Sequence, residues 1–229
     1  MARVALKDPY GWSKLKYQLK EKFGRYIRHG IFNAIELGDE EKAIHLATQQ
    51  VLLRARDEWG SSPLVAAIAA QRPRLVREYI QRGGMFAGDG AMAHASMRGN
   101  LDIVEMLLAA KKDPNEPLPR GGHNDGYTPL MWATNRKFIS VIKALLAGGA
   151  DVDAVAADGC TAVMLTAAAQ PSDLEALDIL RSYKPDIAKK DWRGRNLIRE
   201  ARDREKNSGK PELRRILERH FPNVDFDAA

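Results

Sequence analysis

The chain has 229 residues, of which 45% are hydrophobic and 29% are charged, and its formal net charge is +6. This profile suits a soluble globular protein of one domain or two small ones. The single cysteine, Cys160, excludes an intramolecular disulfide, and no apolar run approaches the roughly 18 residues of a membrane-spanning helix. Because the first residues also lack the apolar stretch of a signal peptide, we expect a cytoplasmic protein or one exported without a classical signal.

The N-terminal segment is basic and predicts an amphipathic helix. Residues 1–30 hold eight Lys/Arg against two Asp/Glu, and an apolar stripe repeats at helical spacing within residues 12–28: Trp12, Leu15, Leu19, Phe23 and Tyr26. We expect residues 1–30 to form a helix that caps the structure following it. Two other interpretations stay open. The helix could contact anionic lipid or an acidic partner, and its lysines could attract nucleic acid, although no readout motif accompanies them.

A period of 33 residues runs through the middle of the chain. Gly126 and Gly159 are 33 residues apart, and so are Thr128 and Thr161. The segment GSSPL places Gly60 twice that distance before Gly126. Three copies in one register predict an array of repeated structural units.

Each copy has the same internal order, which predicts a pair of helices. Ser62 and Thr128 precede a proline and are placed to cap the first helix of their copies. The second helix ends in apolar residues, and Gly148 and Gly149 suit a left-handed exit from it. The predicted core positions of the best-formed copy are Leu130, Ala133, Leu145 and Leu146.

This pattern resembles the ankyrin repeat, and the resemblance covers most of the chain. DGYTPLMWA…VIKALLAGGADVDA is a close match, GSSPLVAAIAAQRPRLVREYIQRGG and DGCTAVMLTAAA…LDILRSYKPDIA are good ones, and AMAHASMRGNLDIVEMLLAA matches in its helices. Met131 stands where the family places a histidine, which replaces a buried hydrogen bond by apolar packing. The resemblance implies an all-α ankyrin-repeat solenoid of about six helix-turn-helix units over residues 31–220, with degenerate units at both ends and a tail at 221–229. The units are expected at 29–56, 57–86, 87–112, 125–154, 157–188 and 192–220.

Two connections depart from the period. Gln71 and Gly99, equivalent positions between helices, are 28 residues apart, whereas Gly99 and Lys137 are 38 apart. We therefore expect the connection MFAGDGAM to have lost its turn and a loop to be inserted at 111–124. The prolines and glycines of that loop exclude regular structure. It either extends a binding face or is a tolerated surface insertion.

Nothing in the sequence predicts catalysis, a cofactor or a metal site. The five histidines are scattered without HExxH spacing, and Cys160 lies in a turn where a nucleophile would need a neighbouring base. His123 and Asp125 are two candidate metal ligands where a site needs three or four. We therefore expect a non-enzymatic protein, although catalytic residues that converge from distant repeats would escape this search.

The resemblance implies that the chain binds another protein through its turn tips and the exposed face of its first helices. Carried over position by position, the turn tips supply Trp59, Tyr127, Lys190, Trp192 and Arg193, and the first helices supply Met97, Arg98, Trp132, Asn135 and Arg136. Aromatic and arginine side chains are enriched at interface hot spots. Trp132 and Trp192 also have a second interpretation, as packing residues.

We expect the partner to dock on the concave face around Tyr127, Trp132, Asn135 and Arg136, beside the inserted loop, and the free chain to be a monomer. Two functions stay open at this point. The protein is either an interaction module or adaptor, of which an effector that binds a host protein is a variant, or a dedicated antagonist such as an immunity protein that occludes an enzyme or toxin.

Overall fold

A computed structural model describes residues 30–118, 126–167, 175–208 and 212–226. The expected N-terminal helix, the distal part of the inserted loop and the last three residues lie outside these ranges. Every regular element within them is an α-helix and none is a strand, so the predicted all-α class is confirmed. The chain divides into two compact units, Met1–Met85 and Phe86–Ala229.

The first unit contains a helix over residues 30–37, α2 (Glu40–Leu46), α3 (Gln49–Arg54), α4 (Pro63–Ala69) and α5 (Pro73–Gln81). The Oγ of Ser62 accepts a hydrogen bond from the backbone N–H of Val65 at 3.2 Å, which starts α4 as predicted. Helix α5 packs against both α4 and α2. The Tyr79 side chain is fully buried at this junction, and its hydroxyl donates to the carbonyl oxygen of Ala43 at 3.4 Å.

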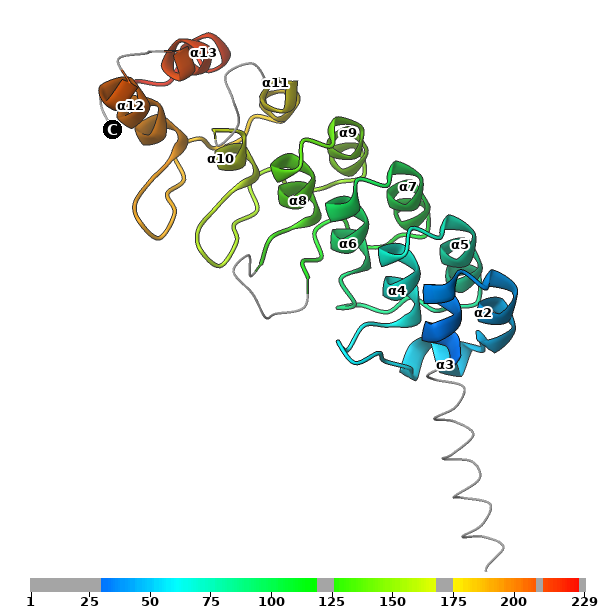
Figure 1. The fold of residues 1–229 in the computed structure, drawn as a ribbon. Helices are drawn as coiled ribbons and strands as arrows, with labels where there is room; N and C mark the ends of the chain where they lie inside the picture. The colour runs from blue at the N-terminus through cyan, green and yellow to red at the C-terminus, as the bar shows by residue number, and fades with distance from the viewer. Residues whose placement is uncertain (1–29, 119–125, 168–174, 209–211, 227–229) are drawn as a thin grey trace, which may run out of the picture. The chain divides into compact units, whose positions relative to one another are not determined.

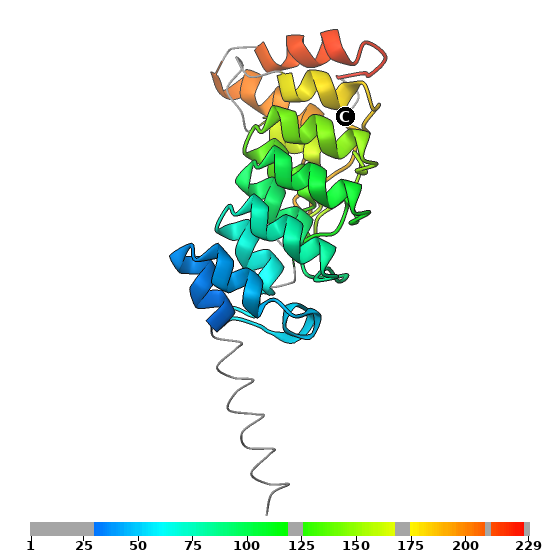
Figure 2. The same cartoon turned by 90° about the vertical axis from the view of Figure 1, so that its right-hand side faces the viewer.

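The second unit contains four helix pairs. They are α6 (Ala91–Arg98) with α7 (Leu101–Ala109), α8 (Pro129–Asn135) with α9 (Ile139–Ala147), α10 (Ala162–Ala167) with α11 (Glu175–Arg181), and α12 (Leu197–Ser208) with α13 (Glu212–His220). The first helices α6, α8, α10 and α12 contact one another in sequence order and form one layer (Figure 1). Helices α7, α9 and α11 form the second layer, which faces the viewer in Figure 2. With the first unit, this makes about six helix pairs, as expected.

The helices α8 and α9 begin and end for the reasons that the sequence suggested, with one exception. The Oγ1 of Thr128 accepts from the N–H of Met131 at 3.3 Å, and proline occupies the first helical position. Met131 is fully buried, which confirms its packing role. Gly149 has a left-handed backbone with φ of 93°, but Gly148 has a φ of −80° and ends the helix without that conformation. The four predicted core residues, Leu130, Ala133, Leu145 and Leu146, are all buried.

The short connection before α6 retains a turn, which corrects the expectation that it was lost. Residues 87–89 form a tight turn in which Gly88 has a φ of 83°. Glycine adopts this left-handed conformation without a steric penalty. The missing five residues therefore shorten the connection but do not remove its change of direction.

The first part of the inserted loop is anchored to that turn by a buried lysine. Residues 111–118 contain no helix, as predicted, yet the Lys112 side chain is only 5% exposed. Its Nζ lies 2.7 Å from Asp89 Oδ1 and 3.0 Å from Glu116 Oε2, and it donates to the carbonyl oxygen of Phe86 at 2.6 Å. Glu116 Oε1 also accepts from the N–H of Gly90 at 2.8 Å. These contacts make residues 111–118 part of the folded array.

Candidate protein-binding surface

Loops of one design precede α4, α10 and α12, and we call them fingers (Figure 1). In the finger before α12, the N–H of Asp191 donates to the carbonyl oxygen of Arg195 at 2.8 Å, and the N–H of Gly194 donates to that of Asp191 at 2.9 Å. The finger before α10 makes the same two bonds between Ala156 and Cys160 and between Gly159 and Ala156, both at 2.9 Å. This closed geometry holds each tip in a fixed position.

The fingers of the second unit are stacked directly on one another. The N–H of Trp192 donates to the carbonyl oxygen of Asp158 at 2.9 Å, which joins two successive fingers. A Cβ atom on Gly159 would lie 2.7 Å from the Cα of Asp191, so only glycine fits between the two fingers. Gly194, the equivalent residue of the last described finger, has no atom within 4 Å of its Cβ direction. Among the described residues, nothing covers this face of the finger before α12.

The tip of that last finger carries an exposed aromatic–cation pair. Trp192 is 69% exposed, and the guanidinium carbon of Arg193 lies 4.5 Å from the centre of its ring. Such stacking of arginine on an aromatic face is favourable and keeps both side chains in one arrangement. The interpretation of Trp192 as a packing residue is therefore wrong. In the first unit, Trp59 occupies a finger tip of the same kind and is 84% exposed.

Asp191 fixes the shape of the finger beneath this pair. Its Oδ1 accepts from the N–H groups of Arg193 at 2.9 Å and of Arg195 at 2.8 Å, and its Oδ2 accepts from the Nε of Arg195 at 2.8 Å. Burial alone would raise the pKa of Asp191, but the hydrogen bonds from the backbone and side chain of Arg195 lower it below its ordinary value. The carboxylate is thus ionised and committed to holding the loop.

Two of the predicted contact residues are buried, which corrects their expected role. Tyr127 and Trp132 are each only 8% exposed, and their rings pack with centroids 5.5 Å apart at an interplanar angle of 59°. A tilted arrangement of this kind is a favourable aromatic contact. Tyr127 lies in the loop before α8 and Trp132 lies in α8, as the sequence indicated, but both side chains point into the repeat and not toward a partner. Trp132 is therefore a packing residue, the second of the two interpretations.

The remaining predicted positions are accessible to different degrees. Asn135 and Arg136 are exposed at the end of α8, and Arg98 is exposed at the end of α6, where Met97 is half-buried. Lys190 is exposed at the base of the last finger. Apart from Trp59, which belongs to the first unit, these residues and the pair Trp192–Arg193 lie on the first-helix layer and fingers of the second unit.

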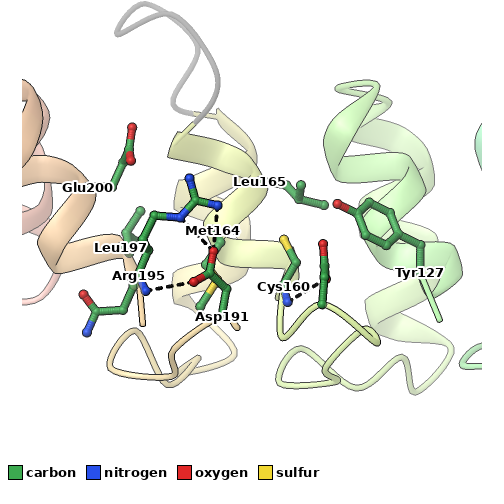
Figure 3. A pocket seen from close by; sticks show the side chains of 10 residues that line it. Tyr127, Cys160, Met164, Leu165, Asp191, Arg195, Leu197 and Glu200 are labelled. Atoms are coloured by element: carbon green, nitrogen blue, oxygen red, sulfur yellow. Dashed lines mark hydrogen bonds and ion pairs between the residues drawn. The ribbon is translucent and has the colours of Figure 1, made fainter. Parts of the chain in front are cut away.

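A hollow of about 290 Å³ opens between the finger before α10, the finger before α12 and these two helices (Figure 3). Its apolar wall comes from Tyr127, Met164, Leu165 and Leu197, and its polar wall from Asp158, Cys160, Asp191, Arg195, Asn196 and Glu200. Burial raises the pKa of the Cys160 thiol and, more strongly, that of the Tyr127 hydroxyl, so both groups are neutral near pH 7.

Sequence reasoning missed the acidic and basic residues of this hollow. One available signal was the spacing Asp-x-x-Gly, which occurs at Asp57 and again at Asp191, each three residues before a finger glycine. Both aspartates accept backbone N–H groups of their own finger. No spacing in the sequence indicates that Glu200 of α12 would reach the same hollow as Asp158.

Within the described ranges, no group of three or more His, Cys, Asp or Glu side chains is arranged to hold a metal ion. Among the described helices, none has both the length and the apolar character needed to cross a membrane.

Paired helices in two layers, joined by stacked fingers, define an α-helical repeat protein of the ankyrin type. Residues 92–191 match the family model for ankyrin repeats in three copies. This chain is an ankyrin-repeat protein.

Relatives with similar sequences carry the same repeats. The chain is 29% identical to human Ankyrin repeat domain-containing protein 63 over 135 residues, which is 53% of this chain and 34% of that protein. It is 29% identical to the mouse B-cell lymphoma 3 protein homolog over 116 residues, which is 48% of this chain and 25% of that protein. The matched region thus spans about a third or less of these curated relatives.

Two solved structures show the same fold. An ankyrin repeat domain from Acinetobacter baumannii has a TM-score of 0.68 at 24% identity, covering 83% of this chain and 96% of that one. The ankyrin repeat protein EF0377 has a TM-score of 0.66 at 22% identity, covering 82% and 96%.

Proposed function

We propose that this chain is a non-enzymatic interaction module that binds a protein partner through the finger tips and first-helix layer of its second unit. Ankyrin repeat domains are generally protein-binding modules. The observation that carries the proposal for this chain is the exposed pair Trp192–Arg193 at the tip of the last finger.

A large aromatic side chain in water is unfavourable unless a partner covers it. Trp192 is nevertheless 69% exposed. Tryptophan and arginine are the residue types most enriched among interface hot spots. The finger is also held by Asp191 and by the bond between fingers, so little conformational entropy is lost when a partner docks.

The first-helix layer extends this contact surface. Asn135 and Arg136 end α8, and Met97 and Arg98 end α6, so all four occupy corresponding positions of adjacent helices. We assign them to the same docking surface. Tyr127 and Trp132 support it from beneath, since their packed rings hold the start of α8 in place.

The test compares binding by variants of the pair with binding by a matched control. The partner is captured from the native cell, identified by mass spectrometry and purified, and its Kd is measured by calorimetry. Trp192→Ala and Arg193→Glu should each weaken binding at least about tenfold, the range of a hot spot. Arg181→Glu makes the same charge change at an exposed position of α11 in the second layer and should leave the Kd unchanged. Equal affinity of all four proteins would place the interface elsewhere.

The same surface would serve an adaptor or an antagonist. These two roles differ in what binding does to the partner. If the purified partner is an enzyme or toxin and loses its activity when the chain is added, the antagonist role is assigned. If its activity is unchanged while a third protein is recruited, the chain is an adaptor.

A further inference from the structure

We infer that the finger before α12 binds an extended acidic segment of the partner protein, which continues the stack of fingers through a main-chain hydrogen bond to Arg193. This inference rests on the proposed function, because it names the part of the partner that meets the finger and the way in which it binds. The geometry comes from the interior of the second unit, where each described loop glycine of the stack faces the backbone of the next finger.

Two interior glycines show how one finger covers the loop before it. A Cβ atom on Gly126, in the loop before α8, would lie 3.0 Å from the backbone nitrogen of Ala157. A Cβ atom on Gly159 would lie 2.7 Å from the Cα of Asp191. In both places the backbone of the next finger crosses directly over the glycine. The Cβ direction of such a glycine therefore marks the position that the next backbone occupies.

The finger before α12 has the same receiving side, and it is open. Arg193 precedes Gly194 as Asp158 precedes Gly159. The carbonyl oxygen of Asp158 accepts the N–H of Trp192 at 2.9 Å, whereas that of Arg193 accepts no hydrogen bond from any described residue. No atom lies within 4 Å of the Cβ direction of Gly194. Unpaired backbone groups at an exposed edge are a template for pairing with another chain.

The interior contact also shows which part of a partner fits. The backbone that crosses the interior glycine comes from residues 190–191, which form neither helix nor turn, and the N–H donor is the residue after them, Trp192. Three consecutive residues of an extended segment therefore suffice. Two of them cross Gly194, and the third donates its N–H to the Arg193 carbonyl oxygen. A helix would not suffice, since its N–H groups beyond the first turn are bonded within the helix.

The charge of the finger favours an acidic segment. Residues 189–195 hold four basic side chains and one acidic side chain. Two of the four are already used, since Lys189 donates to a neighbouring carbonyl oxygen at 2.6 Å and Arg195 lies 2.7 Å from the carboxylate of its own finger. Lys190 and Arg193 are exposed and form no ion pair with any described residue. Carboxylates of the crossing segment would meet these two cations in charge-assisted contacts.

Peptide selection tests this mode of binding without the partner. A phage-displayed library of random linear peptides is first depleted on the full-length Gly194→Asn variant and then selected on the full-length parent. Asparagine tolerates the left-handed backbone, and its side chain would lie in the path of the crossing segment. We expect acidic peptides to be enriched, and the Kd of their synthetic copies, measured by fluorescence anisotropy, to rise at least about tenfold on Gly194→Asn.

The finger before α4 provides the matched control. Gly60 has a φ of 81° and no atom within 4 Å of its Cβ direction, so Gly60→Asn makes the same change at the equivalent position of another finger. It should leave the Kd of the selected peptides unchanged. If no acidic peptide distinguishes the parent from Gly194→Asn, or if Gly60→Asn weakens binding equally, the inference is overturned.

N-methylation of the peptide tests the main-chain bond on the parent protein alone. Methylating each peptide amide in turn removes one N–H and leaves every charge in place. One position should weaken binding at least about fivefold, the scale of a single hydrogen bond, and the same methylation should have no effect on residual binding to Gly194→Asn. If no position has this effect, charge alone attracts the peptide and the main-chain assignment is wrong.

Two further results separate this inference from its alternatives. Displacement of the peptide by oligothymidylate of matching length, at an equal or lower concentration, would assign the finger to nucleic acid and overturn the inference. If no acidic peptide binds while Trp192→Ala still weakens the partner, only this mode of binding fails. If acidic peptides bind as expected while the partner ignores Trp192→Ala, only the proposed function fails.

Discussion

Replacement of Lys112 should destabilise the second unit far more than its position in an inserted loop suggests. Lys112→Met keeps most of the side-chain volume but removes the charge and three contacts of Nζ, at 2.7 Å to Asp89, 3.0 Å to Glu116 and 2.6 Å to the carbonyl oxygen of Phe86. The side chain of Asp89 is 1% exposed and that of Glu116 is 11% exposed, so water cannot replace the lysine.

The expected loss of unfolding free energy is about 3–5 kcal/mol, the cost of leaving a buried charge without its partner. Asp89 would be affected most. Its Oδ2 is already buried without a hydrogen-bond partner among the described residues, and its Oδ1 would keep only the N–H of Ala91 at 2.9 Å. Urea unfolding, followed by circular dichroism and by tryptophan fluorescence, to which the buried Trp132 contributes, gives the free energy.

The neighbouring residue provides the control. Lys111 is exposed, and Lys111→Met should change stability by less than about 0.5 kcal/mol, as surface substitutions do. A double replacement, Lys112→Met with Asp89→Asn, should recover part of the loss because it removes the stranded charge. If Lys112→Met costs less than about 1 kcal/mol, the buried network does not hold residues 111–118 in place and the reasoning fails.

Three further predictions concern the core, the backbone and the finger. Leu145→Ala should cost about 2–5 kcal/mol, since this fully buried side chain leaves a cavity, and a loss below about 0.5 kcal/mol in urea unfolding would contradict the helix register. Gly99→Ala should lower the melting temperature, because the added Cβ would lie 2.7 Å from the Phe138 ring. Lys184 is exposed and has a left-handed backbone with a φ of 54°, so Lys184→Gly should raise the free energy of unfolding by about 0.5–1 kcal/mol. A rise in melting temperature for the first variant and a fall for the second would refute these backbone conformations. The pKa of Asp191 is lowered by folding, so its stabilisation is present above the ordinary carboxyl value of 3.8 and is lost as the pH falls below it. Asp191→Asn should therefore show a smaller drop in melting temperature between pH 7 and pH 3 than the parent, and equal drops would exclude this role.

The helices could be predicted because their signals are local. The capping oxygen of Thr128 and the proline after it act within one turn, and the 33-residue period repeats them. Burial of the regularly spaced leucines followed from the same register. These features depend on residues that are close in sequence, so they could be predicted from this single sequence.

The site could be predicted only in part because its residues depend on contacts between distant segments. Lys112 reads as a charge in a proline-rich loop, and sequence neighbours do not show its burial, because two of its three partners are Asp89 and the carbonyl oxygen of Phe86, the latter 26 residues earlier. The rings of Tyr127 and Trp132 turn inward to meet each other, a choice that residue type alone does not decide. The hollow likewise combines the loops before α8, α10 and α12 with the helices α10 and α12, and these segments meet only because the repeats stack.

Gly159, which the next finger encloses, and Gly194, which is open, differ in the mutations that each can accept during evolution. Gly159 is enclosed by the backbone of the next finger, so any mutation there must disturb two repeats together. Gly194 has a similar left-handed backbone with a φ of 69° but no neighbour within 4 Å, so asparagine or aspartate could replace it at small cost. The finger that carries Gly194 can therefore diversify more freely than the finger that carries Gly159. Natural variation and designed libraries should both accumulate at residues 192–194, where a new partner preference could be acquired without repacking the array.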